Sequence, residues 1–439
     1  MPAITMRDYR ANHRISLNGK TLSEGPCEIH LDDEFLLVKG NRTNRIGYEQ
    51  LESIRQTPTS VEIQMHPAGT VLFDGMDGTL VRPLFLHLSR LRGIRWAFLL
   101  RFIDGAPIDT LECKVRLEGN ADSDATVQLY STGIVGIPFG RDPFQLPLND
   151  LGEFRETDDY QLEYMTPDLK AIFFGGEPSD LGRFHRSVLS ARQRVEEETA
   201  TLLMEVFPAL EFAQLTRLTD LLLRGKAASK SDLYSEVPWL WERIEEVIRT
   251  SAATRDSYAY LRGKTGERLW FGLRRLTSAE KSGVDFGSAE DEPLTPSVDG
   301  VPEEGTAQEP NVQRDYLFWF MAGLESKGHQ WLTVEVISGT KGFATYVYRC
   351  LDSTTNEDPF LATARVISRA MVALNFFREP LYAPQKEIDS GRFAEYKLAV
   401  RKLPYLRQAR QLFVGRAIHT TPEAWQSHLD GLLTESQGG

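Results

Sequence analysis

Cysteine is scarce in this chain: its 439 residues include three, Cys27, Cys113 and Cys350. Because they are odd in number and far apart, they support neither a disulfide framework nor a zinc site, and this usage is typical of a reducing compartment. Long apolar runs are also lacking, since the densest, residues 96–103, is interrupted by Arg101 and falls short of the ~18 residues of a membrane span. The first residues contain no apolar signal region. We therefore expect a cytoplasmic protein.

Sequence signatures of catalysis are missing as well. The eight histidines form no His-x-x-x-His pair, and no Gly-x-Ser-x-Gly elbow occurs. Gly263-Lys264-Thr265 resembles the end of a phosphate-binding P-loop, but Tyr258 stands where that loop needs its first glycine. The sequence therefore predicts no catalytic residue, no metal site and no cofactor. It leaves open, as an alternative, an enzyme whose site forms between domains from residues distant in sequence.

What the chain does contain is an internal repeat with an offset of one hundred residues. Residues 46–55 align with residues 146–155, and the register then continues through each copy. Identical residue types recur at Leu51 and Leu151, Phe73 and Phe173, Gly75 and Gly175, and Arg92 and Arg192. Such self-similarity at a fixed offset marks a duplicated structural unit.

Each copy combines several short segments of strand length, in which apolar and polar residues alternate, with one terminal amphipathic helix. In the first copy, leucines at helical spacing, Leu80, Leu84, Leu88 and Leu91, predict that helix, and residues 180–198 predict its counterpart. The strands predicted in the first copy are residues 27–31, 35–39, 45–48, 60–65 and 70–73, and in the second copy residues 126–130, 133–137, 144–148, 161–165 and 170–174.

This order of elements resembles the pleckstrin-homology-like (PH-like) barrel, a bent antiparallel sheet closed by a C-terminal helix. The resemblance predicts one PH-like domain at residues 1–97 and a second at residues 98–196. PH-like units serve as lipid, peptide and protein readers, and tandem pairs resemble those in histone-chaperone subunits of the FACT type. A fold with so many uses does not by itself imply one function.

Residues 71–81 come nearest to a catalytic motif. They resemble the nucleophile loop of haloacid-dehalogenase-type phosphatases, in which two aspartates stand two positions apart after an apolar strand. Here Asp74 and Asp77 are three apart, and Gly75 stands where the nucleophile would be. The equivalent segment of the second copy, residues 172–177, has no aspartate pair. We interpret the motif as a turn between a strand and a helix.

Residues 197–277 predict a helical, winged-helix-like module. Apolar residues at helical spacing end at Gly225, and Pro238 suits the first turn of a later helix. Residues 258–261 and 268–273 would form a hairpin around a glycine-containing turn. In an alternative, the strand at residues 268–273 pairs with a C-terminal sheet, and a domain boundary at residue 277 would then be wrong.

Charge is uneven along the rest of the chain, whose net charge is -12. Residues 278–313 hold nine acidic residues, one basic residue and four prolines, which predicts a disordered acidic linker. Residues 314–439 predict a C-terminal α+β region, with an antiparallel meander at residues 316–321, 331–337 and 343–349, a helix at residues 360–377 and a basic helical tail. The predicted fold class of the whole chain is α+β.

Two groups of cations are candidate binding residues. Lys39, Arg42 and Arg45 cluster in an early loop of the first barrel, where PH-like lipid readers place their cations, although an acidic chain would be repelled from an anionic membrane. In the tail, cations alternate with aromatic residues that could stack on bases. The candidate anion-binding or nucleic-acid-binding residues there are Arg401, Lys402, Arg407, Arg410 and Arg416. The winged-helix-like module adds Arg243, Arg249, Arg262 and Lys264. Its presumed recognition helix also carries Glu242, Glu245 and Glu246, which would face phosphates with the wrong sign.

From these observations we expect a non-catalytic interaction or scaffold protein whose tandem PH-like barrels recognise a protein partner. The alternative is nucleic-acid or nucleoprotein binding through the basic tail and the winged-helix-like module. Membrane binding is not expected, and the sequence does not set an oligomeric state. Binding that weakens steeply with salt would favour the nucleic-acid alternative.

Overall fold

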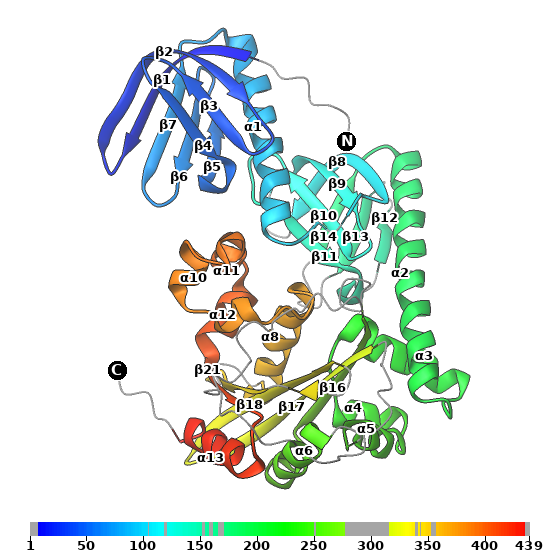
Figure 1. The fold of residues 1–439 in the computed structure, drawn as a ribbon. Helices are drawn as coiled ribbons and strands as arrows, with labels where there is room; N and C mark the ends of the chain where they lie inside the picture. Colours follow the sequence, from blue (N-terminus) through cyan, green and yellow to red (C-terminus); the bar gives the residue numbers. More distant parts are fainter. Residues whose placement is uncertain are drawn as a thin grey trace, which may run out of the picture. The chain divides into compact units, whose positions relative to one another are not determined.

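The computed structural model consists of two compact units, Met1–Arg192 and Gln193–Gly439 (Figure 1). The residues that it describes are 8–103, 105–117, 121–151, 154–157, 161–165, 171–249, 252–276, 316–338, 341–342, 344–352 and 357–434. The acidic segment predicted at residues 278–313 lies outside them. In the described part of the chain, no helix is long and apolar enough to cross a membrane.

The first unit begins with a curled, seven-stranded antiparallel sheet in the order β4-β3-β2-β1-β7-β6-β5. Its elements are β1 (Asp8–Leu17), β2 (Lys20–Leu31), β3 (Phe35–Lys39), β4 (Thr43–Gly47), the short 3-10 helix η1 (Tyr48–Gln50), β5 (Leu51–Gln56), β6 (Val61–Met65), β7 (Gly69–Asp74) and the helix α1 (Gly78–Leu99). Alternate residues of β1 and β6 are buried, as expected of strands with one face on a core. Of the four leucines predicted to close the barrel, Leu84, Leu88 and Leu91 of α1 lie in that core, whereas Leu80 is exposed.

The second sheet repeats the first strand for strand, in the order β11-β10-β9-β8-β14-β13-β12. Its elements are β8 (Asp109–Leu117), β9 (Ser123–Leu129), β10 (Gly133–Pro138), β11 (Phe144–Pro147), η2 (Leu148–Asp150), β12 (Phe154–Thr157), β13 (Gln161–Met165), β14 (Ala171–Gly175) and the helix α2 (Pro178–Val206). Two curled antiparallel sheets in tandem, each followed by a helix, fit the PH-like arrangement. The α+β fold class is confirmed.

The second unit contains a helical region and a third antiparallel sheet. The helical elements before the sheet are α3 (Phe212–Leu221), η3 (Leu223–Gly225), α4 (Lys230–Glu236), α5 (Leu240–Arg249) and α6 (Ala252–Thr265). Residues 258–261 therefore lie in a helix, and the predicted hairpin is wrong. Tyr258 and Leu261 are three positions apart and both are fully buried, which fits one face of a helix better than a strand.

The third sheet has the order β15-β16-β17-β18-β20-β21, with β19 paired to β18. Its strands are β15 (Ala228–Ser229), β16 (Leu269–Arg275), β17 (Tyr316–Ser326), β18 (His329–Ser338), β19 (Lys341–Gly342), β20 (Ala344–Arg349) and β21 (Phe413–Ile418). The described helices of this region are α8 (Pro359–Ala373), α9 (Glu379–Tyr382), α10 (Gln385–Asp389), η4 (Ala394–Tyr396), α11 (Lys397–Lys402), α12 (Pro404–Leu412) and α13 (Pro422–Leu432). The predicted meander and its helix α8 are confirmed.

Strand β16 pairs along its whole length with β17, so the middle region and the C-terminal region share one sheet. This is the alternative pairing that the sequence left open, and the predicted boundary at residue 277 is wrong. The other predicted domain boundaries stay predictions.

Candidate protein-binding body of the tandem barrels

Helix α1 closes the first barrel and also packs on strand β10 of the second (Figure 1). Every residue of β10 is buried, whereas the equivalent strand β3 alternates between half-buried and buried residues. Gly93 makes the close approach possible, because a Cβ at this position would lie 2.3 Å from Cγ2 of Ile137. A glycine inside a helix costs stability relative to alanine, and here it allows the helix backbone to reach the sheet.

Arg92 joins the two barrels at the same place. Its side chain is only 2% exposed, and it donates from Nε to the Leu51 carbonyl (2.6 Å) and from Nη2 to the Glu52 carbonyl (2.7 Å), both in the first barrel. In the second barrel, it donates to the Arg141 carbonyl (3.1 Å) and to Oδ1 of Asp142 (2.6 Å). A buried guanidinium needs such partners, because an unpaired buried charge is strongly destabilising.

The second copy of the repeat conserves part of this arrangement. Arg192 donates from Nη1 to the Leu151 carbonyl at 2.7 Å, as Arg92 does to Leu51. In both copies, this arginine therefore links the closing helix to the leucine that follows the short 3-10 helix. In the first copy, the same side chain also reaches the next barrel.

The loop cations of the first barrel lie together on the β3–β4 hairpin. Lys39 ends β3, Arg42 lies in the turn and Arg45 lies on β4, and all three are exposed. The Arg45 guanidinium stacks 3.8 Å above the centre of the Phe35 ring. The structure thus brings this predicted group together.

The tail cations, in contrast, are spread over two helices and a strand, and two of them have clear internal roles. Arg410 donates to the carbonyls of Pro380 (2.5 Å) and Ala383 (2.9 Å), and burial lowers its pKa. Arg416 stacks on the ring of Tyr382 at 5.0 Å. Arg401 is in α11, next to Lys402, and Arg407 is exposed on α12. The tail aromatics Phe393 and Tyr396 are buried, so they are not exposed platforms for bases.

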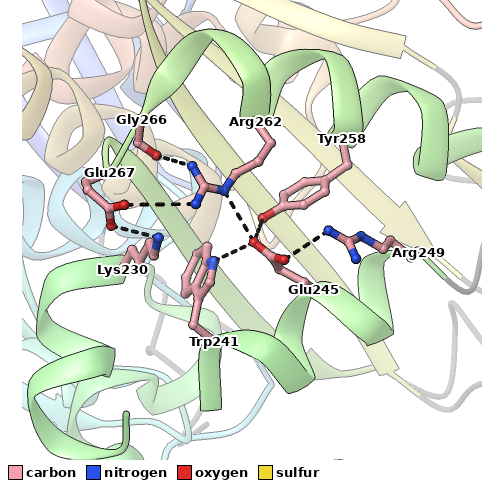
Figure 2. Close-up of polar contacts among 8 residues, drawn as sticks. All are labelled: Lys230, Trp241, Glu245, Arg249, Tyr258, Arg262, Gly266 and Glu267. Atoms are coloured by element: carbon pink, nitrogen blue, oxygen red, sulfur yellow. Dashed lines mark hydrogen bonds and ion pairs between the residues drawn. The ribbon is translucent and has the colours of Figure 1, made fainter. Parts of the chain in front are cut away.

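Two cations of the middle region, Arg249 and Arg262, contact Glu245, a carboxylate on α5 (Figure 2). Its Oε1 accepts from Nε1 of Trp241 (3.1 Å), the hydroxyl of Tyr258 (2.9 Å) and Nε of Arg262 (3.3 Å). Its Oε2 accepts from Nη2 of Arg249 (3.0 Å). Burial raises the pKa of Tyr258, and the negative charge of Glu245 raises it further. The hydroxyl of Tyr258 therefore stays protonated and acts as a donor.

Other cations of this region are also paired with acids. Arg243 lies 2.6 Å from Glu246, and Lys264 lies 2.9 Å from Asp430. Lys230 and Arg262 both approach Glu267, as Figure 2 shows. Because these charges are neutralised within the fold, the middle region offers phosphates little net attraction.

The aspartates of the phosphatase-like motif form the predicted turn. Strand β7 ends at Asp74, and Asp77 is the N-cap of α1. The Asp77 carboxylate accepts from the backbone N–H of Thr79 (2.9 Å) and from its hydroxyl (2.8 Å), and these two bonds lower the pKa of Asp77. Such capping is the ordinary role of an aspartate before a helix.

A buried polar network in the third sheet was missed from the sequence. Glu335 is 1% exposed on β18 and accepts from the hydroxyl of Thr345 (2.6 Å) and that of Ser257 (3.3 Å), and Nε2 of His419 lies 3.3 Å away. Trp425 donates from Nε1 to Thr345 at 2.9 Å. A glutamate inside an otherwise apolar strand was the available signal. Satisfied networks of this kind rigidify a core.

The side chains most relevant to catalysis are the metal ligands and nucleophiles among the described residues. Among them, no group of three or more His, Cys, Asp or Glu side chains is placed to hold a metal ion. An open surface pocket at the β17–β18 turn includes His329, Arg349 and Cys350 in its lining. Burial raises the pKa of Cys350 to about 12, which makes its thiol a poor nucleophile near neutral pH.

Comparisons with known proteins add little to this description. No family model matches the chain, and no curated protein matches it. Among solved structures, the chain is similar to the Spt16D Pob3N heterodimer, with 11% identity, covering 37% of this chain and 83% of that chain at a TM-score of 0.17. No conclusion about function rests on a similarity of this size.

Proposed function

We propose that this chain is a non-catalytic interaction protein whose two barrels act as one body to bind a protein partner. The observation that carries the proposal is the contact between α1 and β10. It buries both faces of β10 and places the buried Arg92 between the barrels. Two barrels fixed in this way present one composite surface, and a preorganised surface loses less entropy on binding than two independent modules.

Nucleic-acid binding through the tail is the second candidate, and it has weaker support. Arg410 and Arg416 are engaged in internal contacts, and the tail aromatics Phe393 and Tyr396 are buried. Single-strand binding depends on exposed cations and exposed rings together. The nearest aromatic residue to the exposed Arg407 in sequence is Tyr405, and this ring is half-buried.

Affinity capture from the cells of origin tests the proposed function. The intact chain serves as bait at low and high salt, and both protein and nucleic acid are identified in the eluates. We expect a protein partner that is retained at both salt concentrations, because apolar and hydrogen-bonded contacts are less sensitive to salt than phosphate contacts. Recovery of nucleic acid alone, lost at high salt, would contradict the proposal.

A variant that uncouples the barrels sharpens the same test. Gly93→Leu places a bulky side chain against Ile137, while Gln193→Leu makes the matched change at an exposed position of the second helix. We expect the first variant to lose the partner and the second to keep it. Equal capture by both variants would show that the composite surface is not what the partner recognises.

A further inference from the structure

The first barrel has an outer face that corresponds to the one that α1 covers in the second barrel. Strand pairing fixes the correspondence: Leu36 lies opposite Leu31 and Ile46, and Ile134 lies opposite Leu129 and Leu146. If Leu36 is equivalent to Ile134, then Leu37 is equivalent to Val135, and Lys39 is equivalent to Ile137. Ile137 is the residue that Gly93 of α1 approaches. Helix α1 itself packs on η1, β5 and β6 of its own barrel and on β10 of the next.

The outer face of β3 and β4 keeps apolar groups at its centre. Leu36 and Val38 are fully buried in the core, so the half-buried Phe35 and Leu37 lie on the opposite face. On β4, Arg45 stands opposite Leu37 and covers the Phe35 ring. Phe35 and Leu37 thus form a short, half-buried apolar strip on the outer face of β3.

The rim of this strip is positively charged. Lys39, Arg42 and Arg45 are exposed, and none of the ion pairs found among the described residues involves them. Glu28 stands opposite Lys39 on the neighbouring strand β2 and pairs with Arg10, and Asp8 on β1 pairs with His30. The second barrel has Ile137 and Gln145 where the first has Lys39 and Arg45, and its β10–β11 loop keeps one cation, Arg141.

We propose that the outer face of β3 and β4 in the first barrel binds an acidic amphipathic helix of a partner protein. The helix lies on Phe35 and Leu37 with its apolar stripe, as α1 lies on β10, and its acidic flank faces Lys39, Arg42 and Arg45. This inference rests on the proposed function and names the surface and the chemistry of its partner. Helix-in-groove recognition is a common mode of peptide binding, and complementary charge gives it speed and specificity.

Site-specific photo-crosslinking from the intact chain tests this proposal. The photoreactive residue p-benzoylphenylalanine replaces Leu37, and in a control chain it replaces Leu22, which is 53% exposed on another part of the same barrel. Each chain is irradiated in extract of the cells of origin, and the crosslinked segment is sequenced by mass spectrometry. We expect position 37, but not position 22, to yield a segment with apolar residues at helical spacing and an excess of Asp and Glu.

Charge reversal supplies the second arm. Lys39→Glu with Arg42→Glu should lower the crosslink yield at position 37 about tenfold, because like charges then meet at the rim. The matched control, Lys20→Glu with Arg55→Glu, changes the net charge equally at exposed positions of the same barrel and should leave the yield unchanged. Equal losses in both variants would overturn the proposal, as would a lipid, a basic segment or a segment without helical periodicity at position 37.

The result also separates this inference from the proposed function. If affinity capture still recovers a protein partner while position 37 crosslinks to none, the β3–β4 face is not the site and the binding role stands. If no protein is captured at all, the proposed function fails, and the surface assigned here fails with it.

Discussion

Nη2 of Arg92 lies 2.6 Å from the carboxylate of Asp142, and the two residues belong to different barrels. The arginine is almost fully buried, while the aspartate is about half exposed. The same guanidinium also donates to backbone carbonyls of both barrels. One side chain of the first barrel's closing helix thus holds the start of the fifth strand of one sheet and the β10–β11 loop of the next.

Replacing Arg92 with alanine should therefore destabilise the first unit strongly. The substitution leaves the carbonyls of Leu51, Glu52 and Arg141 without this donor, and we expect a loss of about 3–5 kcal/mol in the free energy of unfolding. Arg192→Ala should cost less, about 1 kcal/mol, since its bond to the Leu151 carbonyl corresponds to that of Arg92 with Leu51, whereas Arg92 also bonds to Arg141 and Asp142 of the next barrel. Hydrogen exchange of α1 and α2 peptides in the intact chain at increasing urea measures both losses. Equal losses in the two variants would contradict the bridging role of Arg92.

The sequence predicted the repeat and the role of its arginine as a shared structural residue, but not the bridge. An alignment of two copies identifies contacts that recur within each copy, and the contact between Arg92 and Asp142 occurs only between copies. The same limit applies to Gly93, whose counterpart is Gln193. Gly93 differs from its counterpart because it contacts the second barrel, and an alignment of the two copies does not reveal that contact.

The strands missed from the sequence are the same in both copies. The first strands, β1 and β8, and the fifth strands, β5 and β12, carry many charged and polar residues, so their apolar alternation is weak. They form because their backbones pair with the stronger strands beside them. Tertiary pairing overrides local propensity in such strands.

Gly93→Leu should separate the α1 helix from β10. The added side chain meets Ile137 at a position where even a Cβ has no room, and we expect a cost of about 2–3 kcal/mol. Gln193→Leu, at the exposed equivalent position, should change the free energy of unfolding by less than about 0.5 kcal/mol. Hydrogen exchange of the β10 peptide gives the direct measurement. Unchanged protection of β10 in Gly93→Leu would mean that this close contact does not exist in solution.

Asp109 should make the second barrel sensitive to acid. Burial acts to raise the pKa of Asp109, but hydrogen bonds from Ser187, Arg183 and the Thr110 backbone outweigh it, so the pKa is lowered. A lowered pKa in the folded state means that the stabilisation is present above the unfolded-state pKa of about 4 and is lost as the pH falls through the folded-state value.

The variant Asp109→Asn tests this expectation. Wild type should be the more stable protein near pH 6, and the difference should shrink as the pH falls below about 4. Urea unfolding, followed by hydrogen exchange of β8 and α2 peptides at several pH values, provides the comparison. A difference that stays constant with pH would contradict the assigned role of Asp109.

Glu245 should be a structural residue of the second unit. Glu245→Ala removes the acceptor of Trp241, Tyr258 and Arg262 together, and we expect a loss of about 2–3 kcal/mol in the free energy of unfolding. Glu242→Ala, an exposed change on the same helix, should alter it by less than about 0.5 kcal/mol. Urea unfolding monitored by tryptophan fluorescence distinguishes the two. If the variants were equally stable, the cluster in Figure 2 would contribute nothing to the fold.

The distance between the two barrels in solution decides whether they form one body. Burial raises the pKa of Cys27 to about 11 and that of Cys113 and Cys350 to about 12, so these thiols react slowly and cysteines introduced at exposed positions can be labelled selectively. Spin labels at Leu22→Cys in the first barrel and Lys114→Cys in the second allow pulsed electron paramagnetic resonance to measure the distance distribution in the intact chain. One narrow distribution, broadened by Gly93→Leu, is the predicted result. A broad distribution in the otherwise unmodified chain would contradict a single body.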